Sequence, residues 1–394
     1  MNDVSNPKRA TRKIILFSNT AWYLYNFRLP LAHALKEQGW KVVLVAPYDT
    51  YADHLEDAGF EFIHLNMQRR SINIIREFLL LSDLSAIFKS QRPDAILNFT
   101  IKCVIYGSLV AKLVGIRRRI NAVAGLGSVF SAQTMTLSLL RPFVKQLLGA
   151  SLSGGQSRCI VQNPDDADVF LSNDIIDSRQ LVLIKGSGVD GEKFSPNLSK
   201  KSDLKRRKIL FASRLLKSKG IYFYLDAAAA LGEHYDFLVA GEPDPGNPES
   251  IQPQELTALS SQSGVVLLGH VLDMHNLLGD IDLVVLPSEY GEGVPRILIE
   301  AAASGIPLIA FDMPGCREIV RHGENGYLVP KGSQHDLNLA IKRVFSSDSH
   351  YQVLAENSRK HFVSQFEQSD VIQKTLNVID STEVPYATEP GFIH

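Results

Sequence analysis

Short apolar segments alternate with amphipathic segments along the whole chain. Several of the apolar segments have no polar position, as expected of strands that are covered on both faces of a parallel sheet. Helical patterns such as Phe27–Gln38 and Val104–Val114 lie between them. This order predicts an α/β fold built on a doubly wound parallel sheet. The first strands are expected at Lys13–Ser18, Lys41–Ala46, Glu61–Leu65, Asp94–Phe99, Arg119–Ala124, Cys159–Gln162 and Leu181–Lys185.

The alternation stops between residues 186 and 206, where Gly, Ser, Lys and Pro gather and little needs to be buried. It then resumes, so we expect two Rossmann-like domains, at residues 1–186 and 207–380. Residues 187–206 form the predicted linker, and residues 381–394 form a tail. Strands of the second domain are expected at Lys208–Ala212, Phe237–Ala240, Val265–Leu268, Leu283–Leu286, Pro307–Phe311 and Tyr327–Val329.

Length and composition agree with this division. The 394 residues are too many for one ordinary core, and a content of 45% hydrophobic and 21% charged residues is typical of a globular protein. A net charge of -1 argues against a nucleic-acid partner. The 3 cysteines are far apart, which fits a reducing compartment. Neither a signal-peptide pattern nor a run of about 20 apolar residues is present, so we expect a cytoplasmic protein.

The strongest candidate site follows the strand Leu283–Leu286. There the segment 287–296 (PSEYGEGVPR) leads into a helix that is expected to begin near Val294-Pro295. Backbone N–H groups and the dipole at a helix start attract anions. Glu292 and Glu300 are placed to accept hydrogen bonds from sugar hydroxyls. The alternative is that Glu292 only caps the helix and that Glu300 is an ordinary helix residue.

A second candidate site follows the strand Lys208–Ala212, in the segment 213–220 (SRLLKSKG). Ligands of open α/β sheets bind outside the carboxyl ends of the strands, and Arg214 and Lys219 can converge on one anion there. The planar guanidinium and the point charge of the ammonium together suit a diphosphate. The alternative is that Lys217 and Lys219 are solvated surface charges.

In combination these features resemble the family-4 retaining glycosyltransferases of the GT-B fold, in which two Rossmann-like domains face each other across a cleft. The family signature of two glutamates separated by seven residues matches Glu292 and Glu300, and its Arg…Lys-Gly loop matches Arg214, Lys219 and Gly220. The resemblance covers nearly the whole chain. Further matching segments are Gly188-Val189-Asp190, Gln162-Asn163, Asp165-Asp166 and Gly323–Gly326.

The resemblance implies a role for each of these residues. Arg214 and Lys219 neutralise the phosphates of a nucleotide-sugar donor, Glu292 contacts its sugar and Glu300 its ribose. We therefore expect Glu292, Arg214 and Lys219 to be catalytic. The backbone of Gly293, Val294 and Pro295 faces the sugar and diphosphate, beside Gly220. The donor is a UDP-sugar substrate, and neither a cofactor nor a metal is expected. Asp280-Ile281-Asp282 resembles the metal motif of the other glycosyltransferase fold but precedes a buried strand.

The chain departs from the family pattern at two loops. Many members have a His-Gly after the strand that is Arg119–Ala124 here, whereas this chain has Gly125, Leu126, Gly127 and Ser128 after Ala124. The first loop (Ser18–Tyr23) lacks the usual double glycine. The missing histidine removes one candidate base. It fits a mechanism in which the departing phosphate accepts the proton of the acceptor on the same face.

A narrower resemblance concerns the acceptor. The segments 98–102 (NFTIK), 125–130 (GLGSVF) and 25–28 (YNFR) are similar to those of bacterial transferases that add an N-acetylhexosamine to a polyprenyl-diphosphate-linked sugar, of the diacetylbacillosaminyl-diphospho-undecaprenol type. It implies acceptor binding by Thr100, Lys102, Gly125, Gly127 and Ser128, with Lys102 facing the acceptor diphosphate. The alternative for Lys102 is a surface lysine.

Such an acceptor implies contact with the inner face of the cytoplasmic membrane. The segment Leu137–Leu152 has an apolar stripe with Arg141 and Lys145 four residues apart, and Arg117-Arg118-Arg119 is a basic cluster nearby in the sequence. A basic amphipathic helix binds anionic lipid. The same stripe is also what a core-facing helix shows.

Other functional classes remain open or are disfavoured. A dehydrogenase needs a glycine-rich turn after its first strand, and none follows Lys13–Ser18; a P-loop motif is absent. A nucleotide-sugar epimerase of the same fold, a non-catalytic nucleotide-sugar sensor and a transferase with a soluble acceptor stay open. The sequence does not indicate the donor sugar, the base, the linkage, the acceptor saccharide or the oligomeric state.

Overall fold

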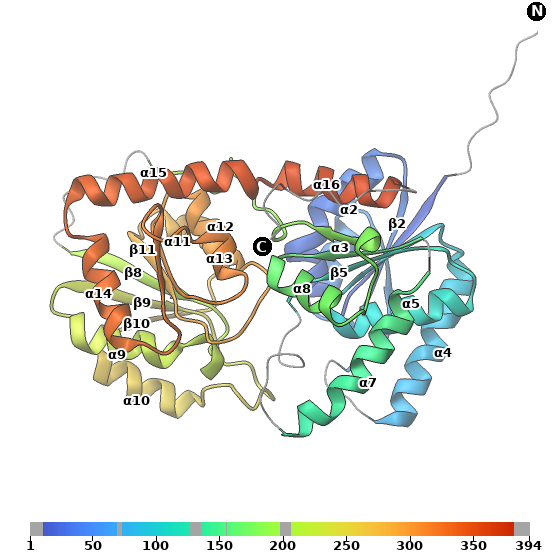
Figure 1. Ribbon diagram of the computed structural model, residues 1–394, viewed down its shortest axis with the longest axis horizontal. Coiled ribbons are helices and arrows are strands. Elements are labelled where there is room, and N and C mark those ends of the chain that lie inside the picture. Colours follow the sequence, from blue (N-terminus) through green and yellow to red (C-terminus); the bar gives the residue numbers. More distant parts are fainter. Residues whose placement is uncertain (1–10, 69–72, 126–134, 155, 198–205, 382–394) are drawn as a thin grey trace, which may run out of the picture.

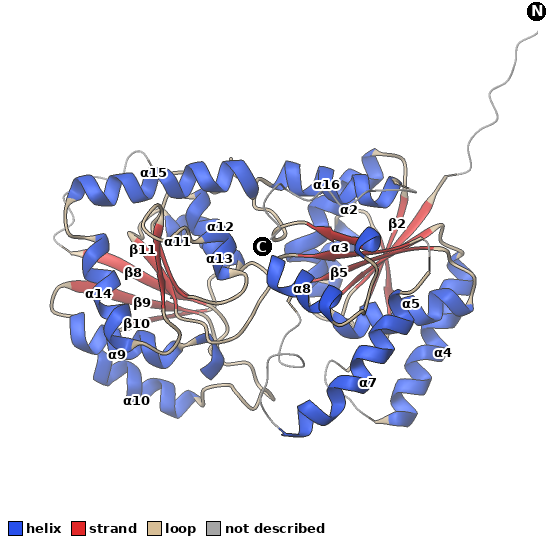
Figure 2. Ribbon diagram, in the orientation of Figure 1, coloured by secondary structure: helices blue, strands red, loops and turns tan. Residues whose placement is uncertain are grey.

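The computed structural model describes residues 11–68, 73–125, 135–154, 156–197 and 206–381, without the side chains of 135–141. Two α/β domains lie side by side, each a sheet between layers of helices (Figures 1 and 2). This is the architecture expected from the alternating pattern, so the predicted fold class is confirmed.

The N-terminal domain contains a seven-stranded parallel sheet with the order β3-β2-β1-β4-β5-β6-β7. Its strands are β1 Lys13–Phe17, β2 Lys41–Ala46, β3 Glu61–His64, β4 Ala95–Phe99, β5 Arg118–Val123, β6 Ser157–Val161 and β7 Leu181–Leu183. Its helices are α1 Ala21–Tyr23, the π-helical turn η1 Leu24–Arg28, α2 Leu29–Glu37, α3 Ala52–Asp57, α4 Ile74–Gln91, α5 Ile101–Leu113, α7 Met135–Leu152, α8 Pro164–Ser172 and the 3-10 turn η2 Ser178–Gln180.

The C-terminal domain contains a six-stranded parallel sheet with the order β10-β9-β8-β11-β12-β13. Its strands are β8 Arg207–Ala212, β9 Tyr235–Ala240, β10 Val266–Gly269, β11 Leu283–Leu286, β12 Leu308–Phe311 and β13 Gly326–Val329. Its helices are the 3-10 turn η3 Lys217–Lys219, α9 Ile221–Leu231, α10 Pro253–Ser263, α11 Met274–Leu278, α12 Arg296–Ala303, α13 Cys316–Ile319, α14 Gln334–Val344 and α15 Asp348–Gln365. Each strand predicted from the sequence is present, with bounds shifted by a few residues.

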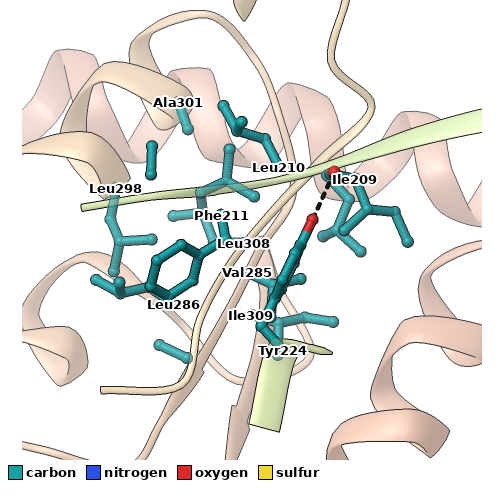
Figure 3. Close-up of a cluster of buried hydrophobic side chains, with 14 of the residues drawn as sticks. Ile209, Leu210, Phe211, Tyr224, Val285, Leu286, Leu298, Ala301, Leu308 and Ile309 are labelled. Atoms are coloured by element: carbon teal, nitrogen blue, oxygen red, sulfur yellow. Dashed lines mark hydrogen bonds between the residues drawn. The ribbon is translucent and has the colours of Figure 1, made fainter. Parts of the chain in front are cut away.

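Burial explains why the apolar runs form strands. In β1, Ile14 and Leu16 pack in one core cluster, whereas Ile15 and Phe17 pack in another on the opposite face of the sheet. In the C-terminal domain the strands share one core with α9 and α12 (Figure 3). Tyr224 of α9 is fully buried there, and its hydroxyl donates a hydrogen bond of 2.7 Å to the carbonyl of Ile209. Packing in these cores holds the strands of both sheets in place, and the loops at the carboxyl edges of the sheets extend from these strands.

The chain crosses between the domains twice. The linker was expected to bury little, but Val189 and Phe194 are buried in the C-terminal core. Val189 also pairs through its backbone with Phe366 and Gln368, at the junction of α15 and α16 (Gln368–Asp380). The expectation was wrong because the many polar residues of the linker obscure the two apolar side chains that pack in this core.

Helix α16 returns to the N-terminal domain, as Figure 1 shows along the upper edge of the molecule. Its Val371, Leu376 and Ile379 pack in the core of that domain, and Arg12 forms an ion pair of 2.8 Å with Asp380. The division proposed from the sequence placed this helix with residues 207–380. An amphipathic pattern predicts a helix and its apolar face, but not which domain that face covers.

Candidate active site

The donor loop, defined here as residues 287–295, follows β11 and ends at α12. In Figure 1, α12 and α13 lie on the side of the C-terminal domain that faces the N-terminal domain. The helix begins at Arg296, and Pro295 is its N-cap with an extended backbone. The predicted start near Val294-Pro295 is thus correct to within two residues. The first turn of α12 lies at the carboxyl edge of the sheet, where N–H groups without a partner in the helix can bind an anion.

Lys219 and Glu292 meet at this loop. The Nζ of Lys219 lies 2.5 Å from Oε1 of Glu292, and Ser288 donates a hydrogen bond of 3.3 Å to the same oxygen. Lys219 reaches this position because the turn after β8 packs directly on the donor loop. Gly220 has a φ of 77°, and a Cβ there would lie 1.8 Å from the carbonyl oxygen of Pro287. Glycine is therefore required at residue 220 for the two loops to touch.

Arg214 lies in the same turn but has a different partner. Its Nη1 forms an ion pair of 2.7 Å with Asp244, in the loop after β9, and its side chain is about half exposed. Asp244 did not stand out in the sequence, because a single aspartate in a polar loop carries no pattern. The structure places both cations of the predicted phosphate clamp at the carboxyl edge, each beside a carboxylate.

Glu300 lies in the second turn of α12, where it is buried. Burial raises the pKa of its carboxyl, and the neighbouring Arg296 opposes that shift through an ion pair of 2.7 Å. The guanidinium of Arg296 also lies 4.9 Å from the ring centroid of Phe27, which belongs to the N-terminal domain. Glu300 is therefore neither a solvated residue nor an apolar-core residue, and its pair with Arg296 lies at the interface of the domains.

Three side chains of the N-terminal domain hold the donor loop and its surroundings from the other side. The backbone N–H of Val294 donates to Oε1 of Gln162 over 3.2 Å, and Asn163 donates to the carbonyl oxygen of Glu292 over 3.1 Å. Asp165 forms an ion pair of 2.9 Å with Arg317 of α13. The sequence had marked Gln162, Asn163 and Asp165 as family-like without giving them a role. Their contacts indicate that they position the donor loop.

Gly125 is predicted to bind the acceptor, and the structure places it against the donor loop. It has a φ of 84°, and a Cβ there would lie 2.8 Å from the backbone nitrogen of Gly293. A Cβ on Gly293 would lie 2.0 Å from Oε1 of Gln162. The backbones of both domains thus approach closely at this point, which leaves no room for side chains. Gly127 and Ser128, also predicted to bind the acceptor, lie outside the described residues.

Lys102, expected to face an acceptor phosphate, has two protein partners instead. Its Nζ lies 2.9 Å from Oε1 of Glu77 in α4 and 2.9 Å from the carbonyl oxygen of Gln68. Its charge is therefore neutralised in this structure. Thr100, which precedes α5, has a φ of 71°, and its buried hydroxyl contacts the thiol of Cys103. The structure places both residues at the carboxyl edge of β4.

The described part of the chain contains no group of three or more His, Cys, Asp or Glu side chains that could hold a metal ion. Asp282 lies at the start of β11 and pairs with Arg207 at the start of β8, over 3.3 Å. These positions are at the amino edge of the sheet, away from the donor loop. Nor does the described part contain a helix long and apolar enough to cross a bilayer.

Comparisons with known proteins agree with this geometry. Residues 13–162 match the family model "Glycosyl transferase 4-like", and residues 195–361 match "Glycosyl transferases group 1". The chain is 28% identical over 381 residues to the N,N'-diacetylbacillosaminyl-diphospho-undecaprenol alpha-1,3-N-acetylgalactosaminyltransferase of Campylobacter jejuni subsp. jejuni serotype O:2, covering 93% of this chain and 98% of that protein. It is 25% identical to the UDP-Gal:alpha-D-GlcNAc-diphosphoundecaprenol alpha-1,3-galactosyltransferase of Escherichia coli, covering 80% and 82% of the two chains.

Among solved structures, Anabaena HepE in complex with UDP and glucose superposes with a TM-score of 0.78 at 18% sequence identity, covering 94% of this chain and 100% of that one. Two Rossmann-like domains, with a glycine-rich donor loop at their interface, define a glycosyltransferase of the GT-B fold. The chain belongs to the family-4 glycosyltransferases, as the sequence pattern had indicated.

Proposed function

We propose that this protein is a retaining, metal-independent glycosyltransferase that moves an N-acetylhexosamine from a UDP-sugar to a polyprenyl-diphosphate-linked saccharide. The observation that carries the proposal is the match of almost the whole chain to the Campylobacter jejuni transferase, whose name specifies such an acceptor. The Escherichia coli relative is also named for a diphosphoundecaprenol-linked acceptor. A shared acceptor class in two relatives supports the same class here.

The donor site supports a mechanism without a metal. Lys219, Arg214 and the first turn of α12 gather positive charge at one edge of the sheet, which is what a leaving diphosphate needs. In our proposal the phosphates replace Glu292 as the partner of Lys219, and Glu292 is then free to accept hydrogen bonds from the donor sugar. Glu300, buried next to Arg296, would accept hydrogen bonds from the ribose hydroxyls.

Retention of the anomeric configuration is supported by the residues of the N-terminal domain that face the donor loop. Gly125 approaches Gly293 so closely that no side chain fits between them, and the preceding residue is Ala124. Neither residue carries a basic group that could remove a proton from the acceptor. In our proposal a phosphate oxygen of the departing UDP accepts this proton, on the same face as the bond that breaks. The acceptor would therefore attach on that face.

The membrane surface expected from the sequence needs revision. In the described part of α7, Leu148 and Leu152 are buried in the core, and Val144 and Leu147 pack against it. Arg119 is also buried, where it donates to the carbonyl oxygens of Ile116 and Ser153. Arg117–Arg119 lie at the start of β5, at the edge of the sheet opposite the donor loop. The described part of the stripe and Arg119 thus face the core, whereas the side chains of residues 137–141, including Arg141, lie outside the described residues.

Helix α4 is a better candidate than α7 for the surface that contacts the membrane. Four large apolar side chains of its first two turns are exposed, including Ile74 at 84% and Phe78 at 72%, together with Ile75 and Leu79. Arg76 lies among them, and Arg69 and Arg70 precede them in the sequence. Exposed apolar side chains with nearby cations favour an anionic lipid surface. Glu77, in the same turns, bonds to Lys102 and so connects this surface to the predicted acceptor side of the cleft.

The experiment is transfer from radiolabelled UDP-sugars by the purified full-length protein, with and without a polyprenyl-diphosphate-linked sugar. We expect transfer with UDP-N-acetylhexosamines, full activity in EDTA, and an α-linked product by proton NMR. Equal transfer to soluble sugars, with no gain from the lipid diphosphate, would exclude the proposed acceptor. Release of a free epimerised UDP-sugar would indicate an epimerase instead. A magnesium-reversible loss of activity in EDTA would exclude the metal-independent mechanism.

A further inference from the structure

A buried arginine without a carboxylate partner lies in the first loop of the N-terminal domain. Arg28 closes the π-helical turn η1, and only 6% of its surface is exposed. Its Nη2 donates a hydrogen bond of 2.8 Å to the hydroxyl of Tyr23, whereas its Nε is buried without a partner. No carboxylate of the described residues forms an ion pair with Arg28. The guanidinium is permanently charged, so this position holds an uncompensated positive charge.

Aromatic rings line the guanidinium but do not neutralise it. Its Cζ lies 4.5 Å from the ring centroid of Phe99 and 5.4 Å from that of Tyr23. The ring faces attract the cation only weakly compared with a carboxylate. Buried charges in proteins are as a rule paired, because removing a lone charge from water is costly. An anion that is absent here would supply that pairing.

Another unsatisfied polar group lies at the same edge of the sheet. Ser18 follows β1, and its hydroxyl is buried without a hydrogen-bond partner; Thr100 follows β4, the neighbouring strand, and its hydroxyl contacts the thiol of Cys103. Thr100 also has a φ of 71°, which is strained for a β-branched residue. It immediately precedes α5, whose first N–H groups have no partner within the helix. A buried hydroxyl and a buried guanidinium nitrogen that both lack a partner call for a physical explanation, and an anion bound at this edge would supply one.

A series of contacts connects this edge to the donor side. The ring of Tyr23 stacks on that of Phe27, with centroids 5.1 Å apart, and Phe27 contacts Arg296, the partner of Glu300. Arg28 therefore lies in the N-terminal domain, across the domain interface from the donor loop. Lys102, the residue that the sequence had suggested for this role, is already paired with Glu77.

We propose that Arg28, together with the hydroxyl of Ser18, binds a phosphate group of the acceptor. The proposal rests on the proposed function, since it specifies which residues recognise the diphosphate of that acceptor. A guanidinium donates two parallel hydrogen bonds to a phosphate, and a hydroxyl adds a further hydrogen bond. The anion would also relieve the uncompensated charge, so acceptor binding and the local stability of the first loop are coupled. Arg28 is a binding and positioning residue in this scheme.

The test compares Arg28→Gln, Arg28→Lys and wild type with two acceptors: the polyprenyl-diphosphate-linked sugar and the same sugar as a neutral methyl glycoside. Arg28→Gln should raise the KM for the diphosphate acceptor about tenfold to a hundredfold, the range expected for a lost charge-assisted hydrogen bond. The KM for the neutral glycoside and the Kd for UDP should not change. Arg28→Lys should fall between the two. A loss of UDP affinity would instead assign the anion to the donor and overturn the proposal, as would an equal KM rise for both acceptors.

Stability separates this role from a purely structural one. Arg119 is an equally buried arginine that bonds to two carbonyl oxygens at the opposite edge of the sheet, so Arg119→Gln is the matched control. Arg28→Gln should leave the melting temperature of the unliganded protein unchanged or higher, because it removes a lone charge. Arg119→Gln should lower it and leave the acceptor KM unaltered. A marked loss of stability in Arg28→Gln, with the KM of the refolded protein unchanged, would show a structural arginine.

A final arm distinguishes failure of this proposal from failure of the proposed function. If wild-type protein transfers nothing to the lipid diphosphate, the proposed acceptor is wrong. Inorganic diphosphate then serves as the probe, titrated calorimetrically with UDP saturating the donor site. Binding to wild type that is lost in Arg28→Gln and weakened in Ser18→Ala would keep the anion site. No binding, or equal binding to wild type and Arg28→Gln, would overturn it.

Discussion

The ammonium of Lys219 lies 2.5 Å from the carboxylate of Glu292, so the cation expected to meet the donor phosphates is bonded to the carboxylate expected to meet the donor sugar. The two side chains are only 10% and 20% exposed. Each therefore compensates the charge of the other, since a buried charge without a partner is costly. Binding of the donor would exchange this ion pair for two contacts with the ligand.

This exchange predicts that a second substitution, at Glu292, restores the stability lost in a Lys219 variant but not its UDP affinity. Lys219→Met leaves Glu292 uncompensated and should reduce the free energy of unfolding by about 1–3 kcal/mol. Glu292→Gln in the same chain should restore part of that loss. UDP affinity should fall at least about tenfold in both Lys219→Met and the double variant, because the phosphate contact is absent in each. Urea denaturation and UDP calorimetry measure the two quantities. Recovery of UDP affinity in the double variant would contradict the assignment of Lys219.

The close approach of the two domains predicts a sharp difference between neighbouring glycines. A Cβ on Gly293 would lie 2.0 Å from Oε1 of Gln162, whereas a Cβ on Gly291 has nothing within 4 Å. Gly293→Ala should therefore displace the donor loop and reduce kcat by about a hundredfold, the scale that a misplacement of 1 Å causes. Gly291→Ala is the control and should behave as wild type. Gln162→Ala in the Gly293→Ala background should recover activity in part. Equal activity of the two single variants would be evidence against this packing.

Burial of Glu300 predicts a pH-dependent stability difference. Burial raises the pKa of Glu300, so the folded protein favours its protonated form. The resulting stabilisation is complete below the ordinary glutamate pKa of about 4.3 and is lost as the pH rises through the raised value. At neutral pH the wild type carries a disfavoured charge that Glu300→Gln lacks.

The unliganded Glu300→Gln protein should therefore melt at the same or a higher temperature than wild type at pH 7.5, with the difference shrinking toward pH 5. Its UDP affinity should nevertheless fall, because the ribose loses a charged acceptor. Melting curves across this pH range and UDP titrations test both statements. A variant that is less stable at pH 7.5 but binds UDP normally would assign Glu300 a structural role beside Arg296.

The exposed apolar turns of α4 predict binding to anionic vesicles. Replacing Ile75 and Phe78 by Asp should weaken co-sedimentation with phosphatidylglycerol vesicles by at least about a hundredfold, since each buried side chain contributes about 1.5–3 kcal/mol. Leu113, equally exposed at the end of α5, is the matched control. Leu113→Asp should bind as wild type. If Leu113→Asp and the α4 variant lose vesicle binding to the same extent, the α4 surface is not the membrane-binding site.

The sequence alone determined the fold and predicted most of the residues that we assign to the donor site. Strands buried on both faces have a composition that can be recognised locally, and the thirteen predicted segments are those of the two sheets. Arg214, Lys219, Glu292 and Glu300 were found because each follows a strand at a fixed spacing. Parallel strands place such loops at one edge of a sheet, so local spacing is sufficient to bring them together.

Only the tertiary structure decided which partner each charged group has. The pairing of Lys102 with Glu77, the burial of Arg119 and the isolation of Arg28 join residues distant in sequence or depend on the depth of a side chain in the sheet. The return of α16 to the first domain has the same cause. Local patterns report which face of an element is apolar, whereas partners are fixed by packing between elements, and that packing depends on the whole chain.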